Sequence, residues 1–260
     1  MNDRKQAIAE FEKLLDILDE LREKCPWDKK QTFETLRKLT IEETYELADA
    51  ISSGSNDAIC SELGDMALHL AFYAKIGAEK GAFTLADVFR GINSKLTYRH
   101  PHVFGNAEAS TATQVEANWE KLKTREGGTY KPVLSGVPTS LPAMVKANRI
   151  QEKARGAGFD WEKPEHVWPK VDEELTELKD EIAVNNPGAI EAEFGDLLFS
   201  VINAARLYGI DPEAALEKTN RKFIKRFNYL EHETVSGGKY LADLSLDEMN
   251  TIWEKAKTAK

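Results

Sequence analysis

Residues 41–65 read IEETYELADAISSGSNDAICSELGD, and each end of this segment carries a pair of acidic residues spaced three apart. Residues three apart lie on the same side of an α-helix. Between the pairs, Ser52 to Asn56 is rich in serine, glycine and asparagine, the residue types that favour turns. The segment therefore predicts two antiparallel helices that bring four carboxylates together. The four residues are Glu43, Glu46, Glu62 and Asp65.

Residues 172–196 read DEELTELKDEIAVNNPGAIEAEFGD, which repeats the same acidic spacing 131 residues later. The turn residues are here Asn185 to Gly188, again midway between the acidic pairs. A single acidic pair on a helix is most often a solvated face. A matched pair across a turn, present twice, instead indicates a shared role. The second quartet consists of Glu174, Glu177, Glu193 and Asp196.

Four converging carboxylates repel one another unless a cation lies between them. Apolar residues at helical spacing flank both quartets, which places the acids near the margin of a core, where unpaired charge is costly. Ligands that are all oxygen select hard cations rather than zinc or copper. The sequence therefore predicts a divalent metal at each quartet, Mg²⁺ with Mn²⁺ as a substitute.

A second repeated pattern, Asn-x-Lys-x-x-x-Arg, follows each quartet. Its two cations are four residues apart and so share one helix face. Such pairs are often surface decoration or partners of acidic helices. In a repeat that also carries a metal quartet, they are equally candidates for holding phosphate oxygens, with the asparagines as supporting hydrogen bonders. The two copies are Asn93, Lys95 and Arg99, then Asn220, Lys222 and Arg226.

Apolar residues recur at helical spacing along most of the chain, and no convincing β-strand alternation is bounded by turns. Asp211-Pro212 and two capping boxes, Thr113-x-x-Glu116 and Ser245-x-x-Glu248, mark helix starts. The sequence therefore predicts an all-α protein with five helices in each of two units. The expected ranges are 4–23, 32–52, 56–80, 84–98 and 111–125, then 142–155, 165–184, 188–208, 211–233 and 245–259.

The repeats predict two tandem helical domains, residues 1–124 and residues 142–260. Residues 125–141 are rich in glycine, serine and proline, which is typical of a linker. The stretch from His100 to Gly105 is expected to be irregular.

The formal net charge is −9, and no apolar run approaches the roughly 20 residues that span a bilayer. An acidic balance argues against a nucleic-acid polymer as partner, because polymer binding needs a broad basic surface. A small anion bridged by a metal is compatible with it. We expect a cytoplasmic protein that does not bind membranes, since no signal-peptide core is present. Cys25 and Cys60 are expected to be free thiols.

Trp27 and Trp161 each lie in a breaker-rich segment ahead of a quartet. Either ring could stack on a nucleobase, and packing within its own segment is the competing interpretation. Trp119 and Trp253 recur with the same neighbours and are expected to pack the last helix of each unit. His69 follows the first quartet by one turn but is not repeated after the second.

Together these motifs resemble the MazG nucleoside triphosphate pyrophosphohydrolases in their full-length, two-domain form. The resemblance rests on Glu-Glu-x-x-Glu with Glu-x-x-Asp in both copies and covers essentially the whole chain. Two further segments carry it, Cys25-Pro26-Trp27-Asp28 and Arg99-His100-Pro101-His102-Val103-Phe104.

The resemblance implies all-α units whose four-helix-bundle cores form on dimerisation, with nucleotide pockets close to the interface. It implies hydrolysis of NTPs and dNTPs to the monophosphate and pyrophosphate with Mg²⁺. By position, both quartets would hold metal, and Lys222 and Arg226 would contact the triphosphate. Base preference is not readable, so broad tolerance and clearance or regulation of nucleotide pools are expected. The denser basic run after the second quartet favours that unit as the main site.

On this interpretation, a water activated by one of the acids attacks the α-phosphorus in line. Pyrophosphate leaves with its charge neutralised by the metal and by Lys222 and Arg226, and two metals per site are compatible with four acids. A ferritin-like oxidase is disfavoured, because it requires Glu-x-x-His pairs. A non-enzymatic helical regulatory or scaffold protein with structural acids is the remaining alternative. Release of pyrophosphate that depends on Mg²⁺ would distinguish the two.

Overall fold

The computed structural model describes residues 2–111, 114–115, 118–119, 122–123 and 131–258. None of these residues lies in a β-strand, and most are helical. The predicted all-α class is confirmed. Close contacts divide the chain into two compact units, residues 1–109 and residues 110–260. The predicted domain boundaries at 124 and 142 stay a prediction, because residues 124–130 lie outside the described part.

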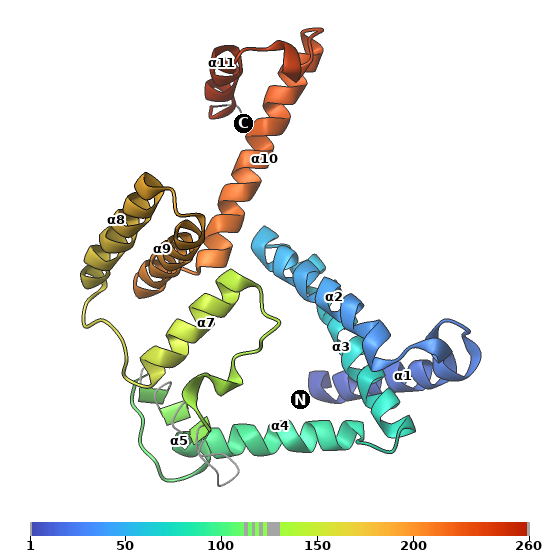
Figure 1. The fold of residues 1–260 in the computed structure, drawn as a ribbon. Helices are drawn as coiled ribbons and strands as arrows, with labels where there is room; N and C mark the ends of the chain where they lie inside the picture. The colour runs from blue at the N-terminus through green and yellow to red at the C-terminus, as the bar shows by residue number, and fades with distance from the viewer. Residues whose placement is uncertain (1, 112–113, 116–117, 120–121, 124–130, 259–260) are drawn as a thin grey trace. The chain divides into compact units, whose positions relative to one another are not determined.

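The first unit is built around an antiparallel helical hairpin (Figure 1). The hairpin turns where the sequence predicts: Gly54, with φ +73°, ends its first helix in the left-handed conformation that favours glycine. Ser55 then caps the second helix by accepting a hydrogen bond from the amide of Ala58. The helices of this unit are α1 (Asn2–Lys24), α2 (Phe33–Ser53), α3 (Asn56–Glu79), α4 (Leu85–Arg99) and α5 (Pro101–Phe104).

Apolar side chains from α1, α2 and α3 meet in one buried cluster in the first unit. Leu18, Leu36 and Ile76 are almost completely buried there, and Phe72 and Ala71 complete the cluster. Because α3 packs on both α1 and α2 at this point, the cluster fixes how the hairpin is held at the end far from its turn.

The second unit repeats the hairpin and adds a long helix after it (Figure 1). Val167, Val171 and Ala204 form the buried apolar cluster that joins the two arms of this hairpin. The last helix folds back against the long one. The helices are α7 (Ala143–Gly156), α8 (Trp168–Val184), α9 (Pro187–Leu207), α10 (Pro212–Ser236) and α11 (Leu246–Ala256).

Local capping explains where the helices of the second unit begin and end. Asn185 ends α8 with φ 54°, a left-handed conformation that asparagine tolerates better than most residues. Asp211 caps α10 by accepting from the amides of Glu213 and Ala214, and Ser245 begins α11 with the predicted capping box. The predicted capping box at Thr113 and Glu116 lies outside the described residues.

Three details differ from the sequence-based expectation. Residues 101–104 form one helical turn rather than irregular structure, because Pro101 sits at the first helical position, where its missing amide hydrogen is not needed. Helix α8 begins only at Trp168, after a 3₁₀ turn over Pro164–Val167. The predicted helix 111–125 lies partly outside the described residues: positions 114–115, 118–119 and 122–123 are helical, whereas Thr111 lies in a bend.

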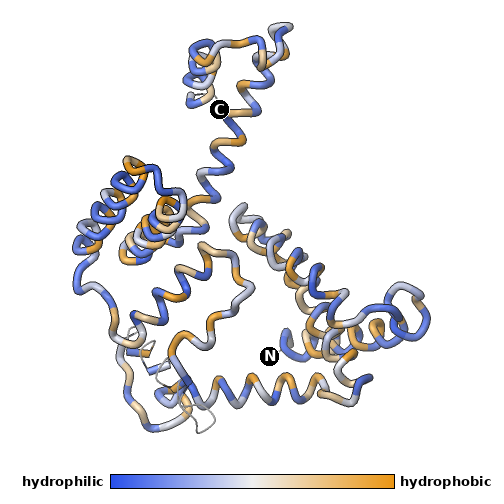
Figure 2. Tube along the Cα trace, in the orientation of Figure 1, coloured by the Kyte–Doolittle hydropathy of each residue, from blue (hydrophilic) through white to orange (hydrophobic). Residues whose placement is uncertain are grey.

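Hydrophilic residues recur along each helix, as Figure 2 shows. Over the described part of the chain, every helix is too short or too polar to cross a membrane. Both cysteines are free thiols, as expected.

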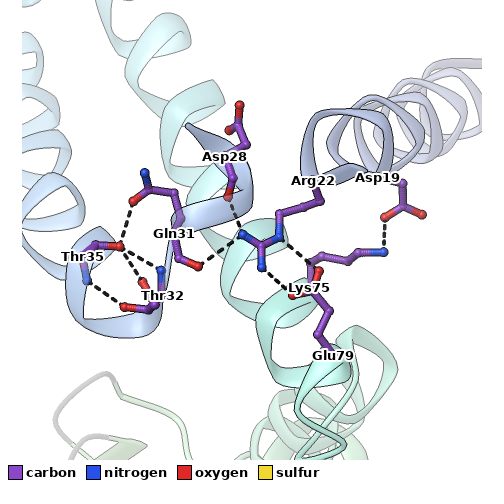
Figure 3. A network of polar contacts seen from close by, with 8 residues as sticks. All are labelled: Asp19, Arg22, Asp28, Gln31, Thr32, Thr35, Lys75 and Glu79. Atoms are coloured by element: carbon purple, nitrogen blue, oxygen red, sulfur yellow. Dashed lines mark hydrogen bonds and ion pairs between the residues drawn. The ribbon is translucent and has the colours of Figure 1, made fainter. Parts of the chain in front are cut away.

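Arg22 of α1 ties the first unit together (Figure 3). Its guanidinium donates to both carboxylate oxygens of Glu79 on α3, and also to the backbone carbonyls of Asp28 and Gln31 in the loop before α2. The Arg22 side chain is only 11% exposed. One buried cation therefore fixes α1, α3 and the loop that carries Trp27 relative to one another.

We predict that Arg22→Met destabilises the first unit by about 2 to 3 kcal/mol, because it leaves the Glu79 carboxylate and two carbonyls without their charged donor. Amide hydrogen exchange of peptides from α1 to α3 measures the change, with peptides of α8 and α9 as an internal reference. Lys24→Met is the matched control, since Lys24 makes only an exposed ion pair with Glu20 and should stay within about 0.5 kcal/mol. Equal protection in the two variants would contradict the role given to Arg22.

Candidate metal and nucleotide site

The two hairpins bring three acids of each predicted quartet together. In the first hairpin these are Glu43 from α2 with Glu62 and Asp65 from α3, and each offers an oxygen within 4.8 Å of the others. We call this set the first cluster. The fourth predicted member, Glu46, is exposed and lies outside it.

The second hairpin brings together Glu174 and Glu177 of α8 and Glu193 of α9 within the same 4.8 Å limit, so Glu177 takes part here where the first cluster has Asp65 of the other helix. We call this set the second cluster. Its fourth predicted member, Asp196, is exposed and lies outside it. Glu174 is buried, with 6% of its surface exposed.

Burial and mutual repulsion disfavour ionisation in the first cluster. The pKa of Glu43 is raised, first by desolvation and then by the charges of Asp65, Glu46 and Glu62. The pKa of Glu62 is raised by desolvation and then by Glu46 and Asp65. Glu46 therefore acts on the cluster electrostatically although it is not one of the three converging groups.

The second cluster shows the same repulsion with one additional acid. The pKa of Glu193 is raised by desolvation first, then by Glu177, Asp196 and Glu174, with Glu181 as the smallest cause. Glu181 occupies the position that Ala50 has in the first unit. Its Oε2 atom is buried and has no hydrogen-bond partner within the described structure.

The donor set of each cluster fits a hard divalent cation. All the candidate ligand atoms are carboxylate oxygens, which magnesium, calcium and manganese prefer. Two oxygens on opposite sides of one ion are about 4.0 to 4.2 Å apart for Mg²⁺ and about 4.6 to 5.2 Å apart for Ca²⁺. Oxygens that already lie within 4.8 Å of one another therefore need at most a small adjustment of their side chains to share one ion.

Lys170 is a charged group at the second cluster that sequence reasoning missed. Its Nζ lies 2.7 Å from Oε1 of Glu174 and 2.9 Å from Oε1 of Glu173. The signal available in the sequence was its position one helical turn before Glu174. That signal was passed over because the first unit has Leu39 at the equivalent position, so Lys170 does not belong to the repeat.

The first unit has a buried polar group beside its cluster. The Thr40 hydroxyl lies 2.7 Å from Nδ1 of His69 and 2.7 Å from the Tyr73 hydroxyl. Burial lowers the pKa of His69, although the charge of Asp65, one turn away on α3, acts in the opposite direction. A neutral imidazole is thus held between α2 and α3, next to an acid of the first cluster.

The predicted phosphate-binding cations lie on other helices. Lys222 is exposed and Arg226 half-exposed on α10, and within the described structure neither makes an ion pair with an acid of the second quartet. Asn220 is exposed on the same helix. In the first unit, Lys95 and Asn93 are exposed on α4, which ends at Arg99. Among the described residues of the second unit, direct ion pairs therefore do not join Lys222 or Arg226 to the acids.

The tryptophans divide into two kinds. Trp27 and Trp161 are 56% and 43% exposed, so neither ring is a core residue. Trp253 of α11 packs on Phe223 of α10 with ring centroids 5.1 Å apart, which confirms the expected packing of the last helix. Phe223 follows Lys222 directly, so this aromatic pair lies close to a predicted phosphate-binding residue.

A family model described as the MazG nucleotide pyrophosphohydrolase domain matches the chain twice, over residues 31–104 and 162–230. The chain belongs to this family. Each match contains one whole acidic hairpin; the first also contains α4, and the second ends within α10. The repeat seen in the sequence is therefore a repeat of the MazG domain.

Full-length relatives support the same assignment. The chain is 44% identical over 256 residues to the nucleoside triphosphate pyrophosphohydrolase/pyrophosphatase MazG of Thermotoga maritima, covering 97% of this chain and 98% of the relative. It is 39% identical over 257 residues to the nucleoside triphosphate pyrophosphohydrolase of Escherichia coli K12, covering 96% and 98%. Bacillus subtilis YabN, which has no assigned activity in its name, is 43% identical over 99% of this chain and 53% of its own length.

These matches confirm the predicted tandem MazG arrangement and the predicted class of enzyme, a nucleotide pyrophosphohydrolase. The acidic clusters are groups that could hold a metal ion.

We predict that Glu62→Gln stabilises the metal-free first unit, because it removes a carboxylate whose ionisation the fold disfavours. The raised pKa means that the native state binds more protons than the unfolded chain, so metal-free stability falls as pH rises through that pKa. The variant should lose the part of this fall that Glu62 causes, while the raised pKa of Glu43 contributes the rest. Thermal unfolding with EDTA and with excess Mg²⁺ measures both effects, since Mg²⁺ should stabilise the parent more than the variant.

Glu42→Gln is the matched control for this prediction, since Glu42 is exposed and is the smallest cause of the raised pKa of Glu43. It should change the metal-free melting temperature less than Glu62→Gln does. A Mg²⁺ response that is identical in the parent and both variants would contradict metal binding at the first cluster.

Proposed function

We propose that this MazG protein hydrolyses nucleoside triphosphates to monophosphate and pyrophosphate in a Mg²⁺-dependent reaction with broad base tolerance. The proposal rests on the observation that each of the two hairpins brings three carboxylates of its quartet to within 4.8 Å of one another. The family model that matches the chain is described as a nucleotide pyrophosphohydrolase domain. A cytoplasmic location and a role in clearing or regulating nucleotide pools are part of this proposal.

Bound Mg²⁺ would supply positive charge that draws the phosphate groups to an acidic site and eases attack on the α-phosphorus. Glu174, Glu177 and Glu193 would hold it in the second unit, and Glu43 with Glu62 and Asp65 would hold it in the first. Glu46 and Asp196, at the margins of the two clusters, are exposed and would accept a proton from an attacking water. Lys222 and Arg226 would stabilise the negative charge of the departing pyrophosphate.

We propose that the protein works as a homodimer. On α9, Phe194, Leu198 and Val201 recur at helical spacing and are 49%, 56% and 46% exposed. The equivalent helix of the first unit, α3, exposes Leu63 and Leu70 in the same register. Stripes of this kind beside the acidic clusters need a cover, and a second copy that supplies it would also bring further helices close to the acids.

We propose the second unit as the main site of turnover. The basic run around Lys222 and Arg226 is denser than its counterpart in the first unit. Lys170 adds a further cation at the second cluster itself, where a triphosphate would need neutralising charge.

Single and double cluster variants test the proposed reaction. Glu177→Gln should reduce pyrophosphate release by roughly a hundredfold or more if the second unit dominates, because it removes an acid from the metal-holding set. Glu46→Gln alone should have a smaller effect, and the double variant should be inactive. The assay is pyrophosphate release from a mixed panel of NTPs and dNTPs with Mg²⁺, with circular dichroism as the control for folding.

Two outcomes would overturn the proposal. Full activity in the double variant would remove the carboxylates from the mechanism. Absence of Mg²⁺-dependent pyrophosphate release from the parent with every nucleotide would favour the non-enzymatic scaffold instead.

Lys222→Met tests whether Lys222 stabilises the negative charge of the departing pyrophosphate. Loss of a cation that acts on the departing pyrophosphate should lower kcat by roughly a hundredfold, whereas loss of a surface cation should change neither kcat nor KM. Lys218→Met, an exposed lysine one turn earlier on α10, is the matched control and should retain parental kinetics. Equal kinetics for both variants would contradict the role given to Lys222.

A further inference from the structure

One acid of the second cluster already has a cationic partner. Lys170 lies one turn before Glu174 on α8, and its Nζ contacts Glu174 at 2.7 Å and Glu173 at 2.9 Å. The hydrogen bonds to Glu174 and then to Glu173 raise the pKa of Lys170, so the amine stays charged near neutral pH. The Glu174 side chain is 9% exposed and that of Lys170 is 41% exposed. A buried candidate ligand is therefore neutralised by a lysine that can swing out into water.

The first cluster has an apolar residue in this position. Leu39, one turn before Glu43 on α2, packs against the buried apolar cluster of the first unit. The charges around Glu43 that affect its pKa are all acidic and all raise it. A cation arriving at the first cluster would meet carboxylates whose repulsion it relieves, with no lysine to displace.

Glu181 acts in the opposite direction to Lys170, because it adds a negative charge to the second unit where the first has Ala50. Its influence on Glu193 is the smallest of the causes that raise that pKa. Coulomb energy falls with distance and with solvent screening. The direct contact of Lys170 at 2.7 Å from a buried carboxylate therefore outweighs a more distant acid.

We propose that Lys170 competes with the metal for Glu174, so that the second cluster binds a divalent cation more weakly than the first and the two units load at different metal concentrations. This inference rests on the proposed function, because it assumes that both clusters hold a metal. Metal binding at the second cluster is then an exchange, in which the ammonium leaves Glu174 for solvent as the ion takes its place.

The test measures Mn²⁺ binding to the full chain without nucleotide, from the electron paramagnetic resonance signal of the free ion. Glu62→Gln disables the first cluster and so reports the second, and Glu193→Gln does the reverse. In the Glu62→Gln background, where only the second cluster binds, adding Lys170→Met should tighten Mn²⁺ binding by roughly five- to tenfold. This is the size expected when one partly buried ion pair no longer competes with the ion. Lys170→Gln, which keeps a polar side chain, should tighten it in the same direction.

Two controls separate competition from a general charge effect. Lys179→Met removes an exposed lysine from the same helix and should leave the affinity of the second cluster within about twofold. Lys170→Met combined with Glu193→Gln should leave the first cluster unchanged. Circular dichroism verifies that each variant is folded.

The outcomes distinguish this inference from the proposed function. If both clusters bind Mn²⁺ and neither Lys170 variant tightens the second, the competition is wrong while the proposed function stands. If the second cluster, with Lys170 intact, binds Mn²⁺ as tightly as the first, the proposal that the first cluster takes up metal at lower concentration is wrong. If the parent protein binds no Mn²⁺ at all, the proposed function itself fails.

Discussion

Repulsion between carboxylates held within 4.8 Å of one another is the constraint on which both units depend. Such a cluster opposes the folding of the hairpin that carries it, and the raised pKa values of Glu43, Glu62 and Glu193 show this opposition. The helices stay together because each hairpin is fixed at both ends. A short turn closes one end, and a buried apolar cluster with an arginine ion pair holds the other.

The two units hold their hairpins together against this repulsion with the same arrangement of turn, apolar cluster and ion pair, but with different residues. In the first, Arg22 reaches from α1 to Glu79 on α3. In the second, Arg206 on α9 pairs with Asp160 in the segment before α8. The hairpin interiors differ as well. In the first unit a hydrogen-bonded polar group is formed by Thr40, His69 and Tyr73. The equivalent positions of the second unit hold smaller or apolar residues, Val171, Ser200 and Ala204.

The hairpins were predictable because their determinants are local. The spacing of the acids, the turn residues and the helical spacing of apolar residues all lie within about 25 residues of sequence. The structure has Gly54 and Asn185 at the two turns, which lie midway between the acidic pairs as the spacing predicts. Which three acids of a quartet converge was not predictable, because it depends on side-chain conformations. The contact between Arg22 and Glu79 spans 57 residues, and no local pattern encodes such a pairing. The helical turn at 101–104 was not predictable in the same way, because proline favours both the end of a helix and its first position, and the local sequence does not decide between them.

An internal repeat predicts what the two units share and not what distinguishes them. Lys170 and Glu181 lie outside the repeat, because the first unit has Leu39 and Ala50 at the equivalent positions. Yet the second unit has one added positive charge at Lys170 and one added negative charge at Glu181, so the distribution of charge beside its acids differs although the net charge does not. Since binding a divalent cation depends on the local field more than on the backbone that supplies the ligands, two hairpins with matching acids need not have matching affinities. On the proposed function, residues one turn outside each acidic cluster would therefore set how readily that copy takes up a metal ion.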